Sequence, residues 1–194
     1  MADVRSTAQT GFEGLVLPAD PKIAIVTTIG ATGRVSLRVR EADAETVGRA
    51  MSVDLSGRIN TAATSGSLNA LRLGPDEWLL LADGERLQEI VSAELAAKAY
   101  AAVDVSDRFV GVEIEGPAVE DVLAAGCPLP MGLAAFPVGR ATRTLYAKAE
   151  VVLWRRAGDR FRIEVGRSFA PYLVGLLATV IRDEAAIGRQ ATAR

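Results

Sequence analysis

The chain of 194 residues is long enough to bury a core without disulfide or metal staples, and its formal net charge of −2 argues against bulk binding of nucleic acid. The sequence contains no histidine, which removes Ser-His and Cys-His nucleophile pairs and imidazole general bases. Its single cysteine, Cys127, excludes an intrachain disulfide and a CxxC metal site and fits a cytoplasmic location. Few enzyme classes remain open to such a chain.

No export or membrane segment is expected. Residues 1–14 hold no apolar run of signal-peptide length. The longest uncharged apolar run, 169–181, is too short to span a bilayer and predicts a buried helix. We therefore expect no membrane partner.

The first half of the predicted domain begins with two strands on either side of a loop at residues 31–33, because β-branched residues cluster there. Apolar residues at helical spacing predict a helix over residues 41–51. Residues 52–67 are rich in Ser, Gly, Asn and Thr and predict a loop.

A tight turn is predicted at residues 74–77, between a strand at 68–73 and a strand that begins at Trp78. Proline fixes φ at the second turn position, and Asp76 suits the third. Asp76 and Glu77 also raise the alternative of a catalytic acid pair. Adjacent residues entering a strand point to opposite faces, so they would not converge on one substrate. The turn is the favoured interpretation.

The second half repeats the order of the first. Strands on either side of residues 106–108 precede a short helix over 117–126, a Pro- and Gly-rich loop over 127–140, and a hairpin that turns at 157–160. The fold class is therefore α+β, with a duplicated unit that predicts antiparallel sheets and helices on one face. In this duplication the turn at 74–77 corresponds to that at 157–160.

A long helix closes each half. Asp83 is expected to cap the first, over residues 84–98, and Ser168 the second. Both helices carry an apolar stripe at i, i+3, i+4 and i+7 spacing. The stripe of the first comprises Leu87, Ile90, Val91 and Leu95.

The domain boundaries follow from this order of elements. We predict an N-terminal arm over residues 1–20, one domain over 21–185, and a C-terminal tail over 186–194. The domain consists of two pseudo-repeats, at about 21–100 and 101–185.

Arginines gather in the second half of the chain. One interpretation is a docking surface for an acidic partner or an anionic ligand, because the guanidinium fork suits carboxylates and phosphates. The other is a solvated sheet face, because exposed runs of charge usually face solvent. In residues 161–165, alternation predicts that Phe161, Ile163 and Val165 lie on one strand face and that Arg162 and Glu164 lie on the other. The docking candidates are Arg140, Arg143, Arg155, Arg160, Arg162 and Arg167.

Other candidate chemistry is weak. Cys127 has no basic neighbour in sequence and is expected to be an inert small hydrophobe. Ser65 and Ser67 match neither a nucleophile elbow nor a Ser-Lys motif, and the chain has no GxGxxG motif and no P-loop. Trp78 and Trp154 are expected to anchor the core or an interface. We assign no residue to catalysis, cofactor binding or metal binding.

Four segments, in this order, strongly resemble the gamma subunit of heterotetrameric sarcosine oxidase. The similarity covers about residues 68–178 and is specific because the order and spacing agree. The segments are "LGPDEWLLL", "VDVSDRFVGVEIEGPAVEDVLAAGCPLP", "AFPVGRATRTLYAKAEVVLW" and "FRIEVGRSFAPYLVGLL".

The resemblance implies the fold of the folate-binding aminomethyltransferases, which is itself built from duplicated α+β units. It implies a complex that oxidatively demethylates sarcosine to glycine with oxygen, giving hydrogen peroxide and formaldehyde or methylenetetrahydrofolate. It also implies partners, the alpha, beta and delta subunits, which carry FAD, FMN, NAD, zinc and tetrahydrofolate. No catalytic residue carries over to this chain.

The leading hypothesis is therefore a non-catalytic structural subunit of a cytoplasmic sarcosine oxidase. The alternative is a free-standing module that binds folate or a similar anionic small molecule through the arginine-rich second half. A folate-dependent aminomethyltransferase ranks last, because the chain is short for that family and shows no clear acidic folate-anchoring position.

Overall fold

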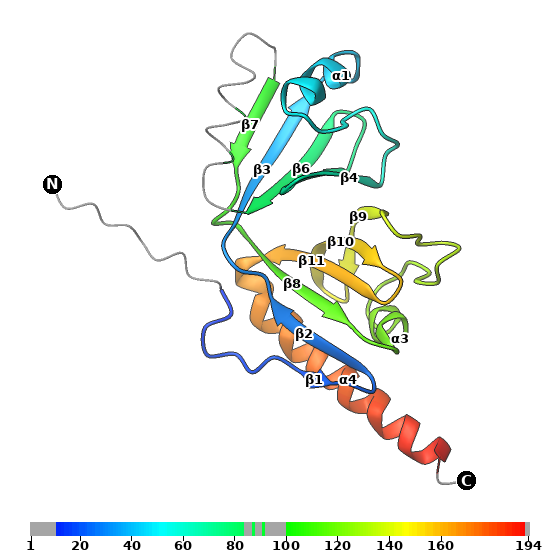
Figure 1. Ribbon diagram of the computed structural model, residues 1–194. Coiled ribbons are helices and arrows are strands. Elements are labelled where there is room, and N and C mark those ends of the chain that lie inside the picture. Colours follow the sequence, from blue (N-terminus) through cyan, green and yellow to red (C-terminus); the bar gives the residue numbers. More distant parts are fainter. Residues whose placement is uncertain (1–10, 84–86, 88–90, 92–99, 193–194) are drawn as a thin grey trace, which may run out of the picture.

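The computed structural model describes residues 11–83, 87, 91 and 100–192, and every structural statement below concerns these residues (Figure 1). The strands of the first half are β1 (Ala19–Asp20), β2 (Ala24–Thr28), β3 (Thr32–Val39), β4 (Thr61–Ser65), β5 (Leu68–Arg72) and β6 (Glu77–Asp83). Those of the second half are β7 (Tyr100–Asp104), β8 (Phe109–Glu115), β9 (Ala141–Tyr146), β10 (Ala149–Ala157) and β11 (Arg160–Gly166). The helices are α1 (Glu41–Ala50), α3 (Val119–Ala124), the 3-10 turn η1 (Arg167–Phe169) and α4 (Ala170–Thr192).

The strands form two antiparallel sheets, which confirms the predicted α+β class. One sheet has six strands in the order β1-β2-β8-β11-β10-β9, and the other has five in the order β4-β5-β6-β3-β7. Without β1, the orders β2-β8-β11-β10-β9 and β7-β3-β6-β5-β4 run through equivalent elements of the two halves. The hairpins β5–β6 and β10–β11 therefore occupy equivalent places, as the predicted duplication requires. The loop predicted over residues 52–67 is wrong at its end, where β4 pairs with β5. β4 lies at the edge of its sheet and none of its residues is buried, so it carries no apolar strand pattern.

The two halves exchange their first strands. β2, from the first half, pairs with β8, while β7, from the second half, pairs with β3. Figure 1 shows β8 continuing from β7 across to the lower sheet. Neither predicted pseudo-repeat therefore contains its whole sheet, a feature that local sequence patterns do not reveal because both pairings are long-range.

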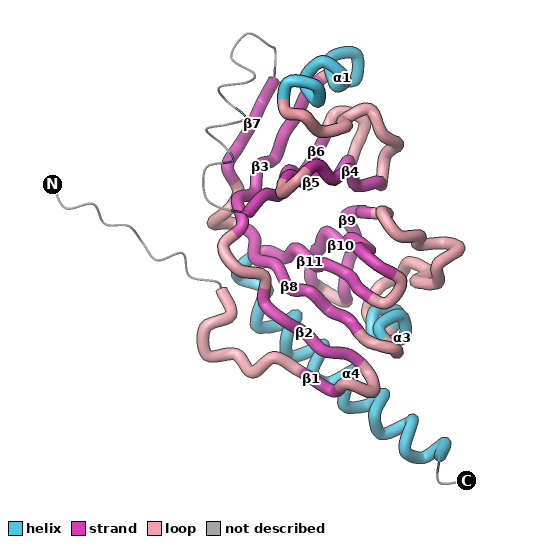
Figure 2. Tube along the Cα trace, in the orientation of Figure 1, coloured by secondary structure: helices cyan, strands magenta, loops and turns pink. Residues whose placement is uncertain are grey.

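Helices cover the outer face of each sheet, and the inner faces meet (Figure 2). Phe161, Ile163 and Val165 of β11 pack in one core with Leu173 and Leu177 of α4. A second core joins the outer face of the five-stranded sheet to apolar residues of α1, and Leu87 and Val91 are buried in it. A third, small cluster lies between the sheets. It comprises Leu71, Leu79, Leu81, Ala141, Val152 and Trp154.

The ends of the domain differ from the predicted boundaries. Phe12 is buried and β1 pairs with β2, so the described part of the predicted arm is attached to the domain. At the other end α4 continues to Thr192, through most of the predicted tail. Ser168 lies inside η1 and is not the residue before a helix. The predicted helix over 84–98, with the cap at its start, lies outside the described residues except at the two buried positions named above.

Candidate functional site

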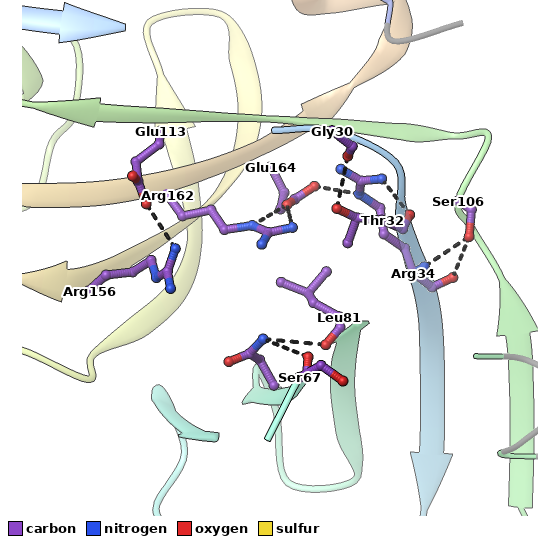
Figure 3. A network of polar contacts seen from close by, with 11 residues as sticks. Gly30, Thr32, Arg34, Ser67, Leu81, Ser106, Glu113, Arg156, Arg162 and Glu164 are labelled. Carbon is purple, nitrogen blue, oxygen red and sulfur yellow. Dashed lines mark hydrogen bonds and ion pairs between the residues drawn. The ribbon is translucent and has the colours of Figure 1, made fainter. Parts of the chain in front are cut away.

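A buried charge cluster joins the two sheets (Figure 3). Arg34 on β3 and Arg162 on β11 both approach Glu164, on the inner face of β11. Arg34 Nε lies 2.6 Å from Glu164 Oε2, and Arg162 Nε lies 2.6 Å from Glu164 Oε1. Arg34 also donates from Nη1 to the carbonyl of Thr32 at 2.9 Å. All three charged side chains are buried, so the pairing is needed to offset their desolvation.

Gly111 makes room for this cluster. It lies on β8 directly opposite Glu164 in the strand register. A Cβ at this position would lie 2.8 Å from Glu164 Oε1 and 3.1 Å from Arg34 Nη2. Any side chain here would displace the carboxylate that both arginines share.

Arg155 lies near the end of β10 and is fully buried, with 0% of its surface exposed. Its guanidinium forms an ion pair with Glu120 and lies 4.8 Å from the ring centre of Phe161. It donates hydrogen bonds to carbonyls of both the hairpin turn and the loop before β9. These acceptors are Ala157, Gly158, Met131 and Phe136.

Arg72, at the end of β5, repeats this arrangement in the first half. It pairs with Glu41 at 2.8 Å and lies 5.1 Å from the ring centre of Trp78. Its carbonyl acceptors belong to the following turn and to the loop before β4. They are Gly74, Pro75 and Gly57. We call Arg72 and Arg155 the arginine clamps; they occupy equivalent positions in the duplicated unit.

The six predicted docking arginines do not form one surface. Arg155 and Arg162 are buried within the chain, so neither guanidinium is open to a partner and the docking role predicted for them is wrong. Arg155 donates to carbonyls of its own chain, and Arg162 Nε donates to Glu164. Sequence alternation correctly placed Arg162 opposite Phe161, but it could not distinguish an inner sheet face from a solvated one.

The other four docking candidates lie nearer the surface, in different places. Arg143 on β9 pairs with Glu77 at 2.6 Å, and Arg160 pairs with Glu115 at 2.6 Å. Arg167 donates to the carbonyl of Asp107 at 2.9 Å. Arg140 donates to the carbonyl of Ala135 at 2.6 Å.

Asp76 lies in the turn between β5 and β6, and Glu77 begins β6. The amide of Leu73 donates to the carbonyl of Glu77 at 2.9 Å, which closes the hairpin. Their carboxylates bind Arg38 at 3.2 Å, and Glu77 also binds Arg143. Glu77, 15% exposed, thus links β6 to β9 of the other sheet. The hydrogen bond to Glu77 raises the pKa of Arg143 above its ordinary value.

The remaining candidates also have structural surroundings. Cys127 is buried, with its Sγ 3.7 Å from the hydroxyl of Thr144. Trp78 and Trp154 are buried core residues. Within the described part of the chain, no group of three or more His, Cys, Asp or Glu residues could hold a metal ion. No helix there is long and apolar enough to cross a membrane.

Sequence reasoning missed four residues that organise this region: Arg34, Arg72, Gly111 and Glu164. A signal existed in the sequence. Arg34 and Arg72 each interrupt or end a strand that is otherwise apolar on its buried face, which is unusual unless the charge is paired. Their partners lie far away in the sequence, however, and spacing alone could not identify them.

These features define a class: a duplicated α+β chain whose charged interior residues are used to hold two sheets together. Comparison with known proteins agrees. The sequence signature of the sarcosine oxidase, gamma subunit family matches residues 34–182. The chain belongs to that family.

Individual relatives support this assignment. The sarcosine oxidase subunit gamma of Corynebacterium sp. (strain U-96) is 32% identical over 114 residues, which cover 58% of this chain and 56% of that protein. The subunit gamma of Arthrobacter sp. is 38% identical over 86 residues, or 44% and 42% of the two chains. The matched segment thus spans about half the length of these curated relatives.

Solved structures extend the likeness over most of the chain. A chain of the heterotetrameric sarcosine oxidase from Corynebacterium sp. U-96, in complex with pyrrole 2-carboxylate, matches with a TM-score of 0.79 at 27% identity. The match covers 86% of this chain and 88% of that one. The glycine cleavage system aminomethyltransferase T from Bartonella henselae matches at 15% identity with a TM-score of 0.63, over 80% of this chain and 45% of that one. This second likeness shows that the fold is aminomethyltransferase-like.

Proposed function

We propose that this chain is a non-catalytic subunit of a heterotetrameric sarcosine oxidase. The observation that carries the proposal is the agreement of family and fold: the family signature covers residues 34–182, and the structural match to the sarcosine oxidase chain covers 86% of the protein. In this proposal the complex oxidatively demethylates sarcosine to glycine with oxygen, giving hydrogen peroxide and formaldehyde or methylenetetrahydrofolate.

The proposal assigns the chemistry to other subunits. We propose alpha, beta and delta subunits as partners, with FAD, FMN, NAD, zinc and tetrahydrofolate bound there and no cofactor bound by this chain. The charges that converge between the sheets support a structural role, because Glu164 is occupied by Arg34 and Arg162. A carboxylate held between two guanidinium groups is a poor general base, since its lone pairs are already engaged. The buried, unpaired Cys127 supports the proposed cytoplasmic location.

The mechanism we propose for the chain is that of a rigid scaffold. The arginine clamps fix the loops before β4 and β9 against the two hairpin turns. The buried charge cluster and the Glu77–Arg143 pair hold the sheets in one relative position. Surface loops with a fixed geometry lose little conformational entropy when they bind, which favours a stable assembly.

The alternative, a free-standing module for folate or another anion, has less support. Such a module needs guanidinium groups open to a ligand. Arg155 and Arg162 are buried, and Arg143 and Arg160 are already paired with carboxylates. Calorimetric titration of the purified chain with tetrahydrofolate separates the two proposals, because only the alternative predicts heat of binding to the isolated chain.

The direct test is co-expression of this chain with the alpha, beta and delta subunits of the same organism, followed by gel filtration. We expect one yellow complex that contains this chain and forms hydrogen peroxide from sarcosine. Elution as a separate colourless protein, while the other subunits keep full activity, would sink the proposal.

A further inference from the structure

The loop between α3 and β9, residues 127–139, carries no charged side chain, no hydroxyl and no amide. Figure 1 shows this loop projecting from the right side of the view. Three of its own residues, Cys127, Met131 and Phe136, are buried. The side chains of Leu133 and Val138 are 54% and 53% exposed. Five further residues of the loop are exposed: Pro128, Pro130, Gly132, Ala134 and Pro137. We call residues 127–139 the apolar loop.

The apolar loop is held in a fixed shape from below. Arg155 donates to the carbonyls of Met131 at 2.8 Å and Phe136 at 3.0 Å, and Arg140 donates to that of Ala135 at 2.6 Å. The ring of Phe136 packs at 5.8 Å from that of Phe161. The exposed apolar side chains are therefore displayed on a pre-organised surface, which lowers the entropic cost of binding.

The first half provides an internal control. Residues 51–60 connect α1 to β4, the equivalent place in the duplicated unit, and Arg72 binds this connection through the carbonyl of Gly57. There the buried residues are also apolar, but the exposed positions include Asp54 and Arg58. The fold is thus compatible with a loop that exposes charged residues at this place. The exposed apolar side chains of the second loop need another explanation, and exposed contiguous apolar surface marks interaction sites.

The surface continues onto the first half of the chain. The amide of Ala141 donates to the carbonyl of Asn60 at 3.1 Å, and the amide of Ala62 donates to that of Gly139 at 2.8 Å. These bonds place Ile59, which is 45% exposed, next to the end of the apolar loop.

Two arginines without a carboxylate partner in the described part of the chain lie at the border of this surface. Arg58 precedes Ile59, and Arg140 follows the apolar loop. Among the residues that the structure describes, neither arginine forms an ion pair with a carboxylate. By contrast, Arg143, three residues further on, is paired with Glu77. An apolar centre depleted of charge and bordered by arginine has the composition of a protein–protein interface.

We propose that the apolar loop, together with Ile59, is the surface on which this chain docks against another subunit of its complex. The partner surface is apolar at its centre and carries carboxylates opposite Arg58 and Arg140. The inference rests on the proposed function, since it takes its occupant from that assembly, and adds to it the location of the contact.

The test replaces the two most exposed large side chains of the apolar loop by a charge. Leu133→Asp/Val138→Asp is compared with Val103→Asp/Ile187→Asp, a control with 57% and 60% exposed residues elsewhere. Each variant is co-expressed with the other subunits, and association is measured by gel filtration and by titration of the purified parts. Leu133→Ser/Val138→Ser serves as a milder version, and the thermal unfolding temperature of each isolated chain verifies folding.

We expect the Asp double variant to associate at least tenfold more weakly than the wild-type chain, the Ser variant to follow in the same direction, and the control to associate normally. Normal association of the Asp variant, or an equal loss in the control, would overturn the inference while the proposed function stands. A wild-type chain that fails to associate would overturn both. A wild-type dimer of the isolated chain that the Asp variant dissociates would assign this surface to self-association and also overturn the inference.

Discussion

Among single residues, Gly111 and Tyr146 lie where close packing meets a buried polar group. Gly111 has no room for a Cβ because the shared carboxylate of Glu164 lies directly above it. The buried ring of Tyr146 packs against the backbone of Gly126. A Cβ added at Gly126 would lie 2.7 Å from this ring. At both positions close packing adjoins a buried polar contact. At Gly111 it is the Glu164 ion pair, and at Tyr146 it is the hydrogen bond from the hydroxyl to the carbonyl of Val122.

Gly111→Ala is expected to destabilise the chain by roughly 2–4 kcal/mol, because overpacking is added to a strained buried ion pair. The matched control is Gly175→Ala, on the exposed face of α4, where nothing lies within 4 Å of the new Cβ. That change is expected to stabilise the chain by about 0.5–1 kcal/mol, the helix preference of Ala over Gly. Urea unfolding of both variants measures the two effects. Equal effects of one sign would contradict the role of Gly111.

Tyr146 predicts an alkaline loss of stability. Its hydroxyl donates to the carbonyl of Val122 at 2.9 Å, and burial raises the pKa of Tyr146 above its ordinary value of about 10. The folded state therefore holds this proton more tightly than the unfolded state does. The resulting stability is fully present below about pH 10 and is lost as the pH rises above that value.

The measurement is the free energy of unfolding in urea at pH 8 and at pH 10.5, for the wild-type chain and for Tyr146→Phe. We expect Tyr146→Phe to cost about 1 kcal/mol at pH 8, the usual value of one hydrogen bond, and to lose less stability on going to pH 10.5. If Tyr146→Phe loses as much free energy of unfolding between pH 8 and pH 10.5 as the wild-type chain does, other groups cause the alkaline loss of stability.

At the scale of the elements, the two arginine clamps explain how each hairpin is fixed to the loop before the neighbouring strand, β4 or β9. Arg72 ends β5, and Arg155 lies two residues before the end of β10. Each binds carbonyls of the hairpin turn and of the loop before the neighbouring strand. A guanidinium has five donors in a planar fork, whereas an ammonium is a compact point charge on a flexible stem. A lysine at either position would keep the charge but could not donate to all of these carbonyls.

Arg155→Lys is expected to destabilise the chain by about 3 kcal/mol or more, because it keeps the charge but leaves buried carbonyls unpaired. Arg72→Lys should act in the same direction. The neighbouring Arg156 is exposed and pairs with Glu113 at 2.9 Å, so Arg156→Lys should cost less than about 1 kcal/mol. Chemical denaturation of the three variants compares them. A similar cost at positions 155 and 156 would argue against the clamp.

At the scale of the whole molecule, the exchange of first strands makes the two halves interdependent. β2 supplies an inner strand of the six-stranded sheet, and β7 supplies the edge of the other. Glu77–Arg143 and the Arg34–Glu164 pair add contacts across the same boundary. Unfolding one half would remove a strand from the other and expose its core.

We therefore expect a single cooperative unfolding transition, although the sequence consists of two repeats. Differential scanning calorimetry should give one peak whose calorimetric and van't Hoff enthalpies agree. Gly111→Ala, at the junction of the sheets, should lower the temperature of that peak without splitting it. Two separate transitions would mean that the repeats are independent domains.

Much of the fold was predictable because it depends on local patterns. The alternation of Phe161, Arg162 and Ile163 correctly identified the two faces of β11, and residues 74–77 were correctly predicted as a turn. The site was less predictable. Arg155 and Arg162 had the same local appearance as surface arginines, and only their distant partners decide that they are buried.

The amino-acid sequence by itself determined most of the order of strands and helices, with β1 and β4 as exceptions, together with the internal duplication and the family. These follow from periodicity and turn chemistry within short windows, and from ordered segments of similarity. Only the tertiary structure decided which sheet each first strand joins, that Arg34 and Arg162 share Glu164, and that Glu77 links the two sheets. Each of these is a contact between residues whose separation in the sequence carries no periodic signal, so the packing of the two sheets determines them.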